Sequence, residues 1–112
     1  MRKLTFALLS GALLVPVFAG AETFNNVPVV DTNCSKRAAS APDSHTRECA
    51  LKCAGSGFGI ITSDNRYLRF DKAGNEQILS QLKSSDKKDH LRVNVSGDVQ
   101  GDMLKVKSVT LE

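Results

Sequence analysis

The chain has 112 residues, of which 41% are hydrophobic and 24% charged, with a formal net charge of +3, three cysteines and no tryptophan. A chain of this size has room for one small domain, and such a domain gains from a covalent or metallic staple. The basic residues are scattered among acidic ones instead of forming a stripe, which argues against a nucleic-acid partner.

The first 21 residues predict a signal peptide. Arg2 and Lys3 precede an apolar stretch over 4–17, and Ala19-Gly20-Ala21 offers a cleavage site. The apolar stretch is shorter than the roughly 20 residues of a spanning helix, so no integral membrane anchor is expected. Cleavage leaves one domain over 22–112, with 13 basic and 12 acidic residues and a net charge of +1. We expect an exported protein, periplasmic or extracellular.

The mature chain begins with a predicted strand over 24–31, where Pro28 favours an edge position. A serine cap, an early proline and an acid at Ser40-Ala41-Pro42-Asp43 then predict a helix over 42–53. The glycines at 55, 57 and 59 indicate a turn after it, because no strand precedes them and no helix follows, as a phosphate-binding loop requires.

The remaining pattern is mainly that of strands. Branched, aromatic and alternating residues predict strands over 58–62, 66–70, 91–96 and 103–111, and helical spacing predicts a short helix over 76–84 after a turn at 71–75. A phase shift in the last strand predicts a bulge near Ser108. Three strands, a helix and two strands follow the order of the OB-fold, a five-stranded, partly open barrel. The sequence therefore predicts a mainly β, OB-fold-like barrel with a helix-bearing insertion at about 32–57, between the first two strands.

The chemistry lies in that insertion. Cys34, His45, Cys49 and Cys53 are thiol and imidazole groups of the kind that bind zinc or copper(I). The spacing of four places the last three along one side of the predicted helix. On a straight helix the α-carbons of His45 and Cys53 are about 12 Å apart, so Cys34, His45 and Cys49 form the easier set and Cys53 a conditional fourth ligand.

A disulfide is the alternative, because exported cysteines are more often bridged than free. Cys34 with Cys49 or Cys53 closes a loop worth about 3 kcal/mol in the chain-entropy model, and Cys49 with Cys53 is also within reach. Every pairing leaves one thiol over, which favours a ligand, a partner or a reactive thiol.

Enzymatic activity is not indicated. The Cys-x-x-x-Cys spacing differs from the Cys-x-x-Cys of thioredoxin-like enzymes, and no third residue orients a pair of Cys49 and His45 for hydrolysis. Tyr67 and Phe70 fit a barrel core better than a base-stacking platform.

Several motifs together resemble a family of small secreted bacterial proteins of uncharacterised function. They are Val30-Asp31-Thr32-Asn33-Cys34, the run from His45 through Cys49 to Cys53-Ala54, Tyr67-Leu68 with Phe70, and the closing Leu91-Arg92-Val93-Asn94-Val95-Ser96-Gly97. The resemblance implies the Cys, His, Cys, Cys arrangement and an OB-like barrel, and it implies no activity.

The sequence thus predicts an exported, non-enzymatic domain that binds zinc or copper(I) through Cys34, His45, Cys49 and Cys53. The alternative is a disulfide-stapled module with one spare thiol, which uses the barrel face to bind a protein or saccharide.

Overall fold

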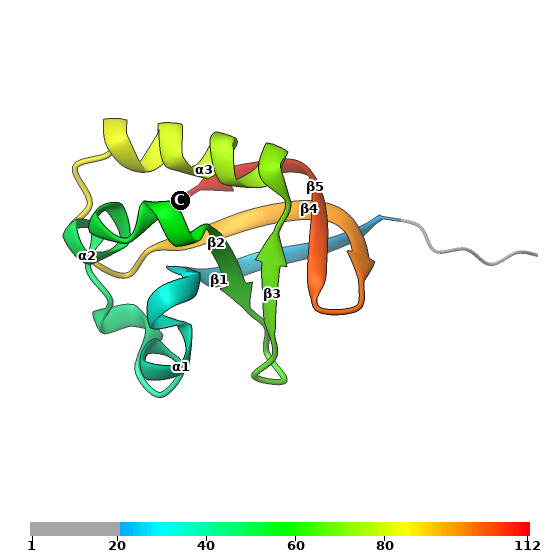
Figure 1. Cartoon of the computed structure of the whole chain (residues 1–112), viewed down its shortest axis with the longest axis horizontal. Helices are drawn as coiled ribbons and strands as arrows, with labels where there is room; N and C mark the ends of the chain where they lie inside the picture. The colour runs from blue at the N-terminus through cyan, green and yellow to red at the C-terminus, as the bar shows by residue number, and fades with distance from the viewer. Residues whose placement is uncertain (1–20) are drawn as a thin grey trace, which may run out of the picture.

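The computed structural model describes residues 21–112, and its strands form a closed barrel in the order β1-β2-β3-β5-β4 (Figure 1). The strands are β1 (Glu22–Asp31), β2 (Phe58–Ile61), β3 (Tyr67–Phe70), β4 (Arg92–Gln100) and β5 (Met103–Leu111). The helices are α1 (Ser35–Ala38), α2 (Arg47–Lys52) and α3 (Lys72–Ser84), with 3₁₀ turns η2 (Thr32–Cys34), η3 (Pro42–Ser44) and η4 (Ala54–Ser56). The predicted signal peptide lies, but for Ala21, outside the described residues. Between 21 and 112 no helix is long and apolar enough to cross a membrane.

The strand pairing confirms the predicted OB-like order. Neighbouring strands are antiparallel except β3 and β5, whose parallel pairs Arg69 with Met103 and Phe70 with Leu104 close the ring. Helix α3 connects β3 to β4, and the insertion over 32–57 connects β1 to β2. In Figure 1, the insertion lies at the end of the barrel where β1 ends, with α2 next to α3 and α1 apart from both, and α3 runs along one side of the barrel.

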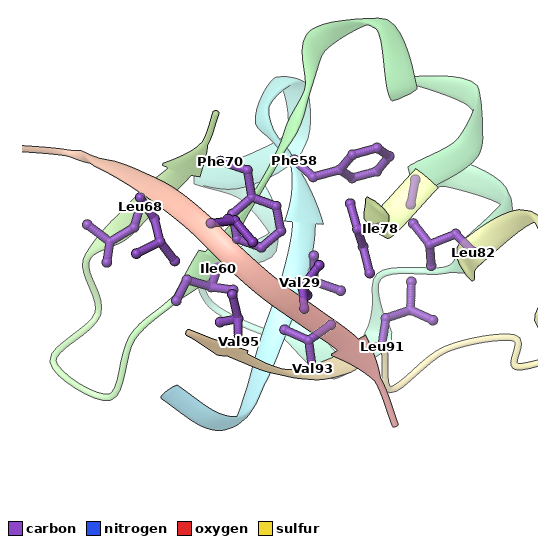
Figure 2. Close-up of a cluster of buried hydrophobic side chains, with 14 residues drawn as sticks. Val29, Phe58, Ile60, Leu68, Phe70, Ile78, Leu82, Leu91, Val93 and Val95 are labelled. Atoms are coloured by element: carbon purple, nitrogen blue, oxygen red, sulfur yellow. The ribbon is translucent and has the colours of Figure 1, made fainter. Parts of the chain in front are cut away.

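The hydrophobic core joins the barrel interior to one face of α3. Ile78 and Leu82, four residues apart and both fully buried, lie near Phe58 and Leu91 (Figure 2). Burial of each such side chain stabilises the fold by about 1.5–3 kcal/mol relative to its exposure. Helix α3 is also fixed to β5 by Gln81, whose Nε2 donates to the Val109 carbonyl at 2.7 Å and whose Oε1 accepts from the Leu111 amide at 2.6 Å.

The predicted helix over 42–53 is wrong. Pro42 begins only the turn η3, His45 is extended at ψ 125°, and α2 starts at Arg47 after its cap Thr46, which accepts from the Cys49 amide. Tertiary contacts separate the two halves, because Asp43 is held by Arg92 of β4 while the Arg47 amide donates to the Lys88 carbonyl.

The Arg92–Asp43 pair anchors the insertion to the barrel. The guanidinium donates through Nε and Nη2 to the two carboxylate oxygens, at 2.9 and 3.0 Å, a bidentate geometry that adds specificity as well as energy. The hydrogen bond from Arg92 holds the pKa of Asp43 below its usual range. The pair therefore stabilises the fold above the ordinary carboxyl pKa, and this contribution falls as the pH drops through the lowered one.

Two other predictions concern the pairing of the strands. The bulge near Ser108 is confirmed, since the β4–β5 register shifts between Ser96 and Gly97, opposite Ser108 and Val106. Pro28 does not lie in an edge strand, because β1 pairs with both β2 and β4, although its β2 pairs begin only at Val29.

The turn predicted at 71–75 is wrong, because α3 already begins at Lys72. Asp71 caps the helix by accepting from the Gly74 amide at 3.1 Å. Gly74 is buried, and a β-carbon there would lie 2.4 Å from Val106 Cγ2 and 3.0 Å from Phe70 Cβ. Gly74 therefore allows close packing of α3 on the sheet and does not form a turn.

We predict that Gly74→Ala destabilises the protein. The gain in helix propensity, about 1 kcal/mol, is outweighed by overpacking against Val106, leaving a net loss of about 1 kcal/mol or more in urea unfolding. Gly55→Ala is the matched control, because a β-carbon there meets nothing within 4 Å. Equal stability of the two variants would contradict the packing role.

Candidate metal centre

The site is built around Asp31, the last residue of β1. Its side chain is 0% exposed, and Oδ2 accepts from the Cys34 amide at 3.0 Å, which caps the turn η2. Oδ1 lies 2.6 Å from Nε2 of His45. A carboxylate out of water is costly unless it is paired, and these two contacts supply that pairing. The cap also holds the backbone of Cys34 close to the end of the strand.

Cys53 lies close to Asp31 and Cys34 because hydrogen bonds connect η2 to the segment of η4. The Thr32 amide donates to the Gly57 carbonyl at 2.8 Å, and the Asn33 amide donates to Ser56 Oγ at 3.0 Å. Gly57, at φ +84°, lets the chain turn into β2, whose Phe58 pairs with Asp31. The antiparallel pairing of β1 and β2 therefore brings the two ends of the insertion together, with Cys34 at one end and Cys53 at the other.

The result is a compact group of three donors. One carboxylate oxygen of Asp31 and the sulfur atoms of Cys34 and Cys53 all lie within 4.8 Å of one another. Asp31 and Cys34 are buried, whereas Cys53 is half-buried. All three cysteines are unbridged. Sulfur and oxygen donors at this spacing are able to converge on one metal ion with small movements.

The four predicted ligands are only partly brought together. Cys34 and Cys53 share the three-donor group, while His45 contacts its Asp31 member. Cys49 is exposed on α2, and with Cys34, Arg37 and His45 it lines a hollow of about 240 Å³. Neither His45 nor Cys49 joins the compact group found among residues 21–112.

The sequence analysis missed Asp31 as a donor and ranked Cys53 below His45 and Cys49. The 12 Å separation assumed a continuous helix, but the chain is extended at His45, and Cys53 is the residue just after α2. An available signal was the Asp-x-x-Cys spacing at Asp31 and Cys34, because an aspartate caps the amide three residues ahead.

The groups around Cys34 shift its pKa in opposite directions. Arg37 Nη2 donates to the Cys34 sulfur at 3.3 Å and lowers the thiol pKa, but burial, the negative charge and hydrogen bond of Asp31, and Cys53 together outweigh it and raise the pKa. The group is therefore a poor free nucleophile. The negative field that disfavours a second anion favours a cation placed between the donors.

Tyr67 of β3 contacts the backbone next to the site. Its hydroxyl donates to the Val30 carbonyl at 3.2 Å and lies 3.0 Å from Thr32 Oγ1, at the junction of β1 and η2. Burial raises the pKa of Tyr67 from its usual 10.0 to about 12, against a lowering contribution from Thr32 and with a further rise from the charge of Asp31.

The fold and the site together define an OB-like barrel that carries a thiol–carboxylate cluster at the base of an insertion between β1 and β2. Comparisons with protein-family models, curated proteins and solved structures found no match.

We predict that the single tyrosine of the chain ionises in the folded protein with a midpoint near pH 12 and in urea near pH 10. Because the folded pKa is raised, the neutral phenol stabilises the fold below pH 10, and this stabilisation is lost as the pH rises towards 12. Tyrosinate absorbance measures both midpoints. Asp31→Asn lowers the folded midpoint, and a folded midpoint near 10 would contradict the shielding of the half-buried Tyr67 hydroxyl from water.

Proposed function

We propose that the protein binds one zinc ion through Asp31, Cys34 and Cys53. The observation that carries this proposal is the mutual approach of their donor atoms to within 4.8 Å. Zinc bonds of about 2.0–2.3 Å in a tetrahedral arrangement require donor separations of roughly 3.3–3.8 Å, so the side chains need to close by only about 1 Å. The fourth position is left to solvent or to an external donor.

The donor set supports zinc over copper(I). Two thiolates suit both ions, but a buried carboxylate is a hard oxygen ligand, which zinc accepts and copper(I) does not favour. Asp31 is held by its position at the end of β1 and by the Cys34 amide, so it is already oriented before a metal arrives.

His45 and Arg37 support the ligands from outside the group. The imidazole Nε2 of His45 lies 2.6 Å from Asp31 Oδ1, and we assign it the role of orienting that carboxylate. Arg37 donates a hydrogen bond to the Cys34 sulfur, and such a bond stabilises the thiolate that forms when the thiol loses its proton. Cys49 is not a ligand in this arrangement.

We predict stoichiometric zinc binding that depends on the three donors. Cys53→Ser and Asp31→Asn each weaken zinc affinity by about 100-fold or more, whereas His45→Gln weakens it by about 10- to 100-fold, the range of outer-shell partners. Zinc affinity is measured by competition between the fully reduced protein and a chromogenic chelator. The same measurement with copper(I) compares the two metals.

Cys49→Ser is the matched control, because it removes the exposed thiol of the same short helix and leaves the donor group intact. It should bind zinc as the original chain does. A loss of zinc affinity in this variant equal to that of Cys53→Ser would mean that Cys49 is a ligand, which would contradict the proposed donor set of Asp31, Cys34 and Cys53. Absence of zinc binding by the reduced original chain would refute the proposed function.

A disulfide-stapled binding module is the second candidate, and two observations favour it. The sulfur atoms of Cys34 and Cys53 are close enough to pair after a small movement, leaving Cys49 as the spare thiol. The barrel face also carries a groove of about 590 Å³ between the start of β1 and the β2–β3 turn, lined by both apolar and polar groups such as Phe24, Leu68 and Arg66. A protein or saccharide partner would bind there.

Thiol counting with elemental analysis of the exported protein distinguishes the two functions. One free thiol without metal supports the staple, and three thiols with one zinc support the metal centre. Export itself remains our proposal from the sequence, as does the absence of enzymatic activity.

A further inference from the structure

The two candidate states of the cluster use the same pair of atoms. The sulfurs of Cys34 and Cys53 lie within 4.8 Å of each other and of the Asp31 carboxylate. A disulfide requires them about 2.05 Å apart, and zinc requires a pair of separate thiolates. One sulfur pair cannot satisfy both demands, so metal binding and bridging exclude each other at this site.

The different accessibility of the Cys34 and Cys53 thiols gives this pair an order of reaction. Cys34 is 9% exposed and is shielded by Arg37, whereas Cys53 is half-buried and follows the last residue of α2. Thiol–disulfide exchange begins at the sulfur that an external disulfide can reach. Cys53 is therefore the entry thiol, and Cys34, next to it, is the thiol that completes the bond.

The local backbone permits the small closure that bridging needs. Cys53 lies between α2 and η4 with φ −104° and ψ 19°, outside the β-ladder, and its side chain accepts only a long contact of 3.6 Å from Asn33 Nδ2. The Cys34 end is fixed by the Asp31 cap. Movement of Cys53 towards Cys34 therefore leaves the barrel intact.

We propose that Cys34 and Cys53 form a redox switch that releases the zinc ion; this inference rests on the proposed function. The oxidant is a low-molecular-weight or protein disulfide. The zinc-bound thiolate of Cys53 attacks one sulfur of the external disulfide and expels a thiolate. The Cys34 thiolate then attacks the Cys53 sulfur of the mixed disulfide and expels the second thiolate. Two electrons pass from the protein to the external disulfide, two protons are taken up by the released thiolates, and zinc leaves without changing its oxidation state.

The test loads the reduced protein with one zinc ion, removes free metal and adds oxidised glutathione. A chromogenic chelator follows zinc, and mass spectrometry with peptide mapping follows the thiols. The expected result is loss of two thiols and one zinc per chain in step, with a Cys34–Cys53 bridge and full recovery of binding after reduction. Cys49→Ser should behave in the same way.

Cys53→Ser is the comparison variant for the bridge, with circular dichroism to confirm that it folds. Loaded at a zinc concentration that saturates its weaker site, it should form no intramolecular bridge to Cys34. Retention of zinc after the Cys34–Cys53 bridge forms, or bridging of Cys49 with Cys53 instead, would overturn the switch and leave the zinc site standing. Failure of the reduced original chain to bind zinc would overturn both.

Discussion

The buried carboxylate of Asp31 is the constraint on which the rest of the site depends. It ends β1, pairs in register with Phe58 of β2, caps η2 through the Cys34 amide and holds the ring of His45. A charge without solvent must be compensated by its neighbours, and here the neighbours are the segments that form the insertion. The position of Cys34 follows from the cap that this carboxylate forms, whereas Cys53 is placed by the hydrogen bonds between η2 and η4.

The barrel and the insertion have distinct physical roles. The barrel is stabilised by apolar burial, with α3 covering core residues of several strands (Figure 2). The insertion has only short helices and contributes few residues to the core, so polar anchors position it: Arg92 on Asp43, Arg47 on the carbonyls of Lys87 and Leu82, and Tyr67 beneath Thr32. The polar contacts thus hold the insertion on the barrel, and the insertion carries Cys34 and Cys53 of the three-donor group.

The raised pKa of Cys34 connects the electrostatics of the site to its chemistry. Arg37 lowers the pKa of the thiol, but burial and then the negative charge of Asp31 raise it, and that charge also makes the space between the donors favourable for a cation. A metal that binds there must displace the proton, so its affinity rises with pH. An isolated reactive thiolate would need the opposite environment, with positive groups dominating.

The sequence by itself determined the barrel order, because alternation of apolar residues and the helix between the third and fourth strands are local patterns that survive in the fold. It also named Cys34 and Cys53, two members of the three-donor group, as candidate ligands. Tertiary structure decided which donors meet: Asp43 and Arg47 are held by different partners, the helix breaks at His45, and β1–β2 pairing joins the ends of the insertion beside Asp31. Such contacts link residues far apart in the chain, so the local pattern of apolar and polar residues does not predict them.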